Sequence, residues 1–75
     1  MNKQRALEYI QALPDDEPVL LFRGQDKLAT LTGTCWLALA NTHGVNEHKI
    51  SCMAEEVNAM QDWQFVNLHT TKLPD

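Results

Sequence analysis

The sequence predicts a mostly helical fold, in which three helices and one short extended segment form a small domain. Three observations lead to this prediction. Apolar residues recur at helical spacing in three stretches. Capping residues, prolines or glycines bound those stretches. The 75 residues leave room for one domain, 1–75, and their 44% hydrophobic share is typical of globular chains rather than disordered ones.

The first helix is expected over residues 2–13. Ala6, Ile10 and Leu13 follow helical spacing, and Asn2 can cap the first turn. Residues 14–18, Pro-Asp-Asp-Glu-Pro, end this helix, because a residue that precedes proline is disfavoured in helical conformation.

A short apolar run at residues 19–22 lies between two turns and is predicted to be one buried extended segment. The second helix is expected from about Leu31 to Thr42, with Asp26 or Thr30 as its cap. Residues 35–40 are apolar around nearly the whole helix. We therefore expect this helix to be the most buried one and to be covered on more than one side, with Cys35 and Trp36 in the core.

An α+β alternative also fits the same region. Residues 28–34 are rich in threonine, and Gly33 is unfavourable inside a helix by about 1 kcal/mol. Together with residues 19–22 and a turn between them, they could form a β-hairpin over residues 19–33.

The third helix is the clearest prediction. Residues 43–45, His-Gly-Val, have the form of a helix end with Gly44 in the left-handed conformation, and Asn46 can then cap a new helix. That helix is expected to end near Asn67, and residues 68–75 are expected to form a flexible tail. Its apolar stripe follows alternating three- and four-residue steps, and consists of Ile50, Met53, Val57, Met60 and Gln64.

Charge and composition disfavour several classes of function. The net charge is −4 and the six basic residues are scattered, so direct binding to nucleic acid or to an anionic membrane is not expected. The apolar run at residues 35–40 is too short to span a bilayer, and the first residues lack the apolar stretch of a signal peptide. Two cysteines without a disulfide pattern suggest a reducing cytoplasm.

No catalytic motif or cofactor-binding motif is present, so we do not expect an enzyme or a bound cofactor. Four residues are of metal-ligand type, namely Cys35, His43, His48 and Cys52. Structural zinc sites usually pair their ligands at short spacing, and these two cysteines lie far apart in sequence. We therefore assign no metal site, and a metal-binding regulatory protein is only a third hypothesis.

The aromatic residues at the end of the third helix suggest two roles. Trp63 and Phe65 could close a small core, which is the favoured interpretation, or could form an exposed contact site for a protein partner. If they are exposed, acidic and methionine side chains of the same helix would complete the contact region. Its predicted members are Trp63, Phe65, Met60, Glu55, Glu56 and Asp62.

Three stretches resemble small uncharacterised proteins of phages and prophages: residues 18–29 (PVLLFRGQDKLA), 36–44 (WLALANTHG) and 59–64 (AMQDWQ). The resemblance implies no activity and no functional residue. It implies only a context, because small acidic phage proteins often act by binding a host protein.

The leading hypothesis is a phage- or prophage-encoded, non-enzymatic protein-binding module that occludes a host protein, for example as an anti-defence inhibitor. The alternative is a self-associating structural or accessory protein. In that case the central apolar helix and the Ile50–Met60 stripe would join two copies into a homodimer.

Overall fold

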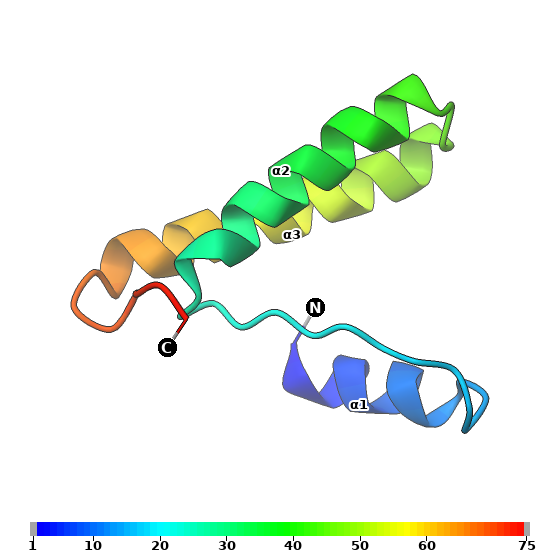
Figure 1. Ribbon diagram of the computed structural model, residues 1–75, viewed down its shortest axis with the longest axis horizontal. Coiled ribbons are helices and arrows are strands. Elements are labelled where there is room, and N and C mark those ends of the chain that lie inside the picture. The colour runs from blue at the N-terminus through cyan, green and yellow to red at the C-terminus, as the bar shows by residue number, and fades with distance from the viewer. Residues whose placement is uncertain (1, 75) are drawn as a thin grey trace.

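The computed structural model describes residues 2–74 and confirms the mostly helical prediction. Helix α1 spans Lys3–Gln11, α2 spans Lys27–Thr42 and α3 spans Glu47–Val66, and residues 2–74 contain no strand. Helices α2 and α3 lie side by side as an antiparallel hairpin (Figure 1). Helix α1 lies apart from this hairpin, and an extended segment connects it to α2 (Figure 1).

Each helix begins at a residue whose side chain accepts a hydrogen bond from a backbone N–H of the first turn. The side-chain oxygen of the cap accepts a hydrogen bond from a backbone N–H two or three residues later, which removes one of the unpaired donors at a helix start. These bonds measure 2.8–2.9 Å, and the caps are Asn2, Asp26 and Asn46. Two of the three were predicted outright, and Asp26 was one of two candidates for α2.

The β-hairpin alternative is wrong, because residues 27–33 are helical. Helix α2 also begins at Lys27, four residues before the predicted start near Leu31. Thr30 and Gly33 are tolerated here because they face α3. The Thr30 hydroxyl lies 3.4 Å from the side-chain oxygen of Gln64, and Gly33 lies directly against Val57.

The α2–α3 connection is a Schellman turn, as predicted. Gly44 has a φ of 71°, which is favourable for glycine and strained for other residues. Its N–H donates to Asn41 at 3.4 Å, and the Val45 N–H donates to the carbonyl of Ala40 at 3.0 Å. Helix α3 then runs from Glu47 to a C-cap at Asn67, as expected.

The residues after α3 return to the start of α2. The Lys72 N–H donates to the Gln25 carbonyl, and the Lys27 N–H donates to the Lys72 carbonyl, both at 2.8 Å. We predicted a flexible tail over residues 68–75. Its described part is tied to the hairpin by these two backbone bonds, and Asp75 lies outside the described residues.

Very little of the molecule is buried. Within residues 2–74 the buried apolar side chains are Ala29, Ala40 and Val57. Helix α2 supplies two of them together with buried Thr30 and Gly33, so it is the most buried helix, as predicted.

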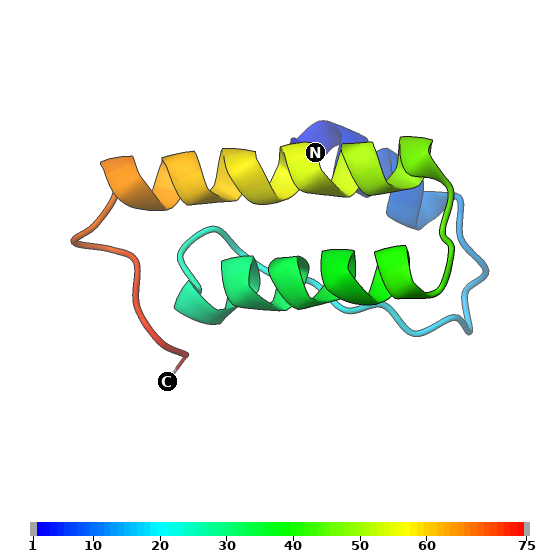
Figure 2. The same ribbon diagram turned by 90° about the horizontal axis from the view of Figure 1, so that it is seen from above.

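The prediction that α2 is covered on more than one side is wrong. Cys35 is exposed, and Trp36 is 39% exposed rather than part of a closed core. Seen from above, α3 flanks α2 along one side only (Figure 2). Because α1 packs against neither helix of the hairpin, the radius of gyration is 13.5 Å, above the value of about 11.3 Å expected for 75 compactly folded residues.

Substitution of Gly33 tests the close contact between the two helices. A Cβ at this position would lie 2.6 Å from Cγ2 of Val57, which is a severe overlap with a stiff side chain. We expect Gly33→Ala to lower the free energy of unfolding by about 1 kcal/mol, because overpacking outweighs the gain in helix propensity. Urea denaturation followed by circular dichroism measures this.

The effect of Gly33→Ala on the free energy of unfolding should change sign when Val57 is replaced by a smaller residue. In a Val57→Ala background, Gly33→Ala should be neutral or stabilising, because only the propensity gain is left. Thr32→Ala, at an exposed position beside Gly33, should stabilise slightly in both backgrounds. A Gly33→Ala variant as stable as Thr32→Ala would contradict the contact.

Candidate protein-interaction surface

An apolar groove lies between the extended segment at residues 19–22 and the face of the α2–α3 hairpin that is turned toward this segment. Its volume is about 390 Å³. We call it the Trp36 groove. The residues that line it are Leu20, Phe22, Ala29, Thr32, Gly33, Trp36, Met53, Glu56, Val57 and Met60.

The hairpin supplies the floor and one wall of the Trp36 groove. The small residues Ala29 and Gly33 of α2 leave space for the groove along this helix, and Trp36 lines the groove next to them. Met53 and Met60 of α3 add flexible, polarisable side chains that can adjust to a bound surface. The groove is therefore apolar and adaptable on the side formed by the helices.

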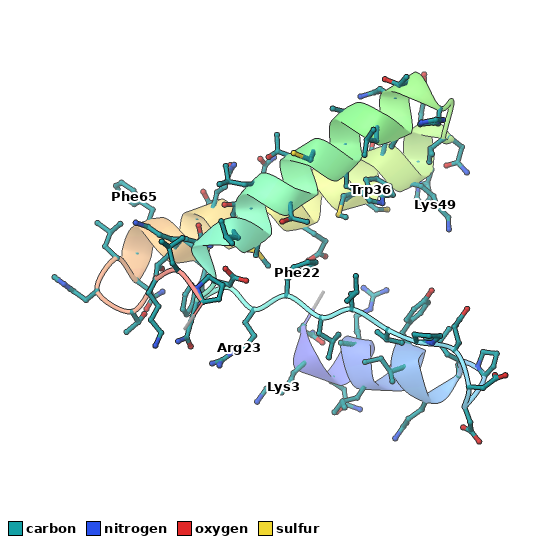
Figure 3. All side chains as sticks on the ribbon, viewed as in Figure 1. Lys3, Phe22, Arg23, Trp36, Lys49 and Phe65 are labelled. Atoms are coloured by element: carbon teal, nitrogen blue, oxygen red, sulfur yellow. The ribbon has the colours of Figure 1, made fainter. Side chains whose placement is uncertain are left out.

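The opposite wall is the extended segment at residues 19–22. Phe22 lies on the side of this segment that faces the hairpin (Figure 3). Leu20 lines the groove as well, although 86% of its surface is exposed, and Phe22 is 49% exposed. The segment was predicted to be buried, and in the structure its apolar side chains are largely open to solvent.

Gln64 fixes the turn that follows this segment. Its side-chain amide donates to the backbone carbonyls of Gly24 and Asp26, each at 2.9 Å, and its oxygen lies 3.4 Å from the Thr30 hydroxyl. These bonds satisfy the amide group and connect the turn, α2 and α3 at one point. The polar residue in the predicted apolar stripe of α3 thus has a structural role that spacing alone did not reveal.

Trp63 lies over the same turn. A Cβ on Gly24 would lie 3.1 Å from Cε3 of the indole ring, so glycine allows the ring to approach the backbone closely. Trp63 is 42% exposed and lines a second, more open hollow of about 720 Å³, together with Lys3 of α1 and Arg23. The residue therefore covers part of the fold and also contributes to its surface.

The structure keeps three of the six residues predicted to form one contact region together and separates the other three. Glu56 and Met60 line both the Trp36 groove and the hollow beside Trp63. Phe65 is 77% exposed and lines a different hollow near Leu68. It lies at the far end of α3 from Trp36 (Figure 3). Trp63 and Phe65 point away from each other because successive residues of a helix turn by about 100°.

The acidic members of that region are also dispersed. Glu55 and Asp62 are exposed on α3 and line neither hollow. Sequence reasoning did not include Leu20, Phe22 or Trp36 in the interaction surface, because their apolar patterns predicted burial. The sequence offered no signal for their exposure, because a 44% hydrophobic share is typical of globular chains.

The four potential metal ligands do not assemble. The Cys52 sulfur lies 3.7 Å from Nε2 of His48 on an exposed turn of α3. Cys35 belongs to α2 and His43 to its C-cap, and residues 2–74 contain no group of three or more His, Cys, Asp or Glu side chains arranged to hold an ion. The hypothesis of a metal-binding protein that uses these four residues together is therefore not supported.

Comparisons with known proteins give no relative. The chain matches no protein-family model, no curated protein and no solved structure. The resemblance to phage proteins stays a prediction. Within the described residues, no helix is long and apolar enough to cross a membrane.

Gln64 offers a direct test of how the extended segment is held. Gln64→Leu should lower the free energy of unfolding by about 2 kcal/mol, because two backbone carbonyls lose their donor. Amides of residues 19–26 should also exchange with deuterium faster than in the wild type. Gln61→Leu, at an exposed position one turn earlier, is the matched control and should change neither quantity. Equal effects of the two variants would contradict the anchoring role.

Proposed function

We propose that this chain is a non-enzymatic protein-interaction module, and that its Trp36 groove receives apolar side chains of a partner protein. The observation that supports this most is that Leu20, Phe22 and Trp36 line one groove while they are 86%, 49% and 39% exposed. Single exposed apolar residues are common on protein surfaces, but a contiguous group of them is typical of a binding site.

The energetics favour binding over permanent exposure. Full burial of one large apolar side chain contributes about 1.5–3 kcal/mol, and buried aromatic residues often dominate the energy of an interface. Trp36 and Phe22 stand on opposite walls of the groove, where a partner side chain would contact both. Two aromatic side chains on either side of one apolar groove are suited to binding an apolar side chain of a protein partner.

The lining of the groove favours binding over catalysis. Glu56 is the one titratable side chain among its lining residues. Acid–base or nucleophilic catalysis generally requires at least two cooperating groups within hydrogen-bond reach. The composition of the groove therefore supports the proposal of a contact surface.

We infer that the partner presents an apolar segment flanked by basic residues. The chain has a net charge of −4, and Glu55 and Asp62 are exposed on α3. Such a charge attracts basic surfaces during encounter and repels acidic ones. In line with the resemblance to phage proteins, the partner would be a host protein whose own working surface is occluded, and an anti-defence inhibitor is one form of this role.

Neighbouring leucines provide a matched test of the groove. Leu20 lines the Trp36 groove, whereas Leu21, which is 72% exposed, lines a separate hollow near Lys72. We expect Leu20→Glu to reduce capture of a specific partner from host lysate at least about tenfold, because it places a charge in the apolar contact. Leu21→Glu should retain capture. Quantitative mass spectrometry after nuclease treatment measures both.

Both leucines are exposed, so neither variant should disturb the fold, which circular dichroism checks. A partner that binds both variants as it binds the wild type would contradict the proposed site. Phe65→Ala in the same assay examines the contact region predicted at the end of α3. If only Phe65→Ala abolishes capture, the binding site lies at the end of α3 and not in the Trp36 groove.

A further inference from the structure

Helix α2 has a second apolar face, which points away from α3. Thr30, Gly33 and Ala40 are buried on the side toward α3. The opposite side repeats apolar residues at three- and four-residue steps, the spacing at which two helices pack along a shared seam. We call this the outer α2 stripe, and it consists of Leu28, Leu31, Cys35, Ala38 and Leu39.

The outer α2 stripe is open to solvent within the chain. Leu28, Leu31 and Leu39 are 42%, 62% and 59% exposed, and Cys35 and Ala38 are exposed as well. Among the described helices, α3 alone packs against α2. Both ribbon views show no helix on the side of α2 opposite to α3 (Figures 1 and 2).

The chain exposes more surface than a compact monomer of its mass, and a second copy could cover part of that excess. The chain exposes 6442 Å². A compact monomer of 8.5 kDa would expose about 4,650 Å², so the excess is roughly 1,800 Å² per chain. A standard protein interface buries about 800 Å² on each partner. Helix α1 and the extended segment contribute to this excess together with the outer α2 stripe, and the whole excess is about twice the area that one standard interface covers on a chain.

The charge distribution favours a second copy as the occupant of this face. Two chains of net charge −4 repel each other, and α3 has exposed acidic residues such as Glu55 and Asp62. Residues 28–42 of α2 contain no charged side chain. Two copies can therefore approach through α2 without placing like charges opposite each other.

We propose that two copies of this chain associate through their outer α2 stripes, about a twofold axis near Cys35. A twofold contact uses the same surface on both chains, so the residue at the middle of the stripe meets its own counterpart. Cys35 lies at that middle, between Leu31 and Leu39. This contact is separate from the Trp36 groove and extends beyond the proposed function.

The structure changes the surface expected for self-association. The central apolar helix, which is α2, was predicted to join two copies together with the Ile50–Met60 stripe of α3. Val57 of that stripe is buried against Gly33 of the same chain, and Met53 and Met60 line the Trp36 groove. The apolar face left for a second copy is the one on α2.

Sedimentation equilibrium at micromolar concentration gives the first test. The wild type should have twice the 8.5 kDa mass of the chain. Leu31→Glu should raise the dissociation constant at least about 100-fold, because the twofold axis places the new charge in the contact twice. Leu68→Glu is the matched control, since Leu68 is 66% exposed, close to the 62% of Leu31, and lies outside the stripe. It should remain dimeric.

A disulfide between the chain's own cysteines gives a second test, in which the wild type is the main sample. Air oxidation should join two wild-type chains through a Cys35–Cys35 disulfide, because Cys35 meets its counterpart and no bulky reagent has to enter the contact. Cys52→Ser should cross-link like the wild type, since Cys52 lies on α3. Cys35→Ser should lose the cross-linked species.

Three results would overturn the proposed dimer. They are a monomeric wild type, a dimer that Leu31→Glu leaves intact, and cross-linking that requires Cys52. A monomer that still captures a partner through Leu20 would leave the proposed function standing. If the chain is dimeric and Leu20→Glu leaves capture of the partner unchanged, the Trp36 groove is not the binding site, and the twofold contact still stands.

Discussion

The close approach of α2 and α3 at Gly33 is the constraint on which the other features of the structure depend. With no Cβ on Gly33, Val57 fits against the backbone of α2, and the two helices lie side by side. About two turns further along α3, the Gln64 side chain reaches the turn that precedes α2 and holds the carbonyls of Gly24 and Asp26. The position of the extended segment, and hence one wall of the Trp36 groove, follows from this contact.

The same arrangement explains why so much apolar surface is left uncovered. Two helices can bury only the faces that they turn toward each other. Helix α1 does not pack on the hairpin, so α2 has one closed seam with Thr30 and Gly33 and one open stripe with Leu31 and Cys35. A chain this small gains little stability from such a limited core, and association with another polypeptide would add to it.

Local features of the fold could be predicted from the sequence, and features that depend on distant residues could not. Asn2, Asn46 and Gly44 determine helix ends through backbone bonds a few residues away, so their roles follow from residue type and position. Thr30 and Gly33 argue against a helix by propensity alone. They are accommodated because Gln64 and Val57, remote in sequence, face them.

The candidate site was less predictable for a related reason. Residues 35–40 are apolar on nearly all sides of the helix, which predicts that most of this part of α2 is covered. The pattern does not indicate whether the same chain or another polypeptide covers it. Trp63 and Phe65 are near each other in sequence and were grouped on that basis, although the helix turns them apart. The spacing of the α3 stripe correctly predicted a packed face, and its intramolecular partner α2 came only from the structure.

The twofold contact through α2 is tested most directly by the reaction rate of Cys35 with a thiol reagent, measured as a function of protein concentration. If two copies associate through the outer α2 stripe, Cys35 reacts readily in dilute protein and becomes protected as the concentration rises, while Cys52 reacts readily throughout. Slow reaction of Cys35 at every dilution would mean that its own chain covers the outer face of α2. Fast reaction at every concentration would mean that no second copy does.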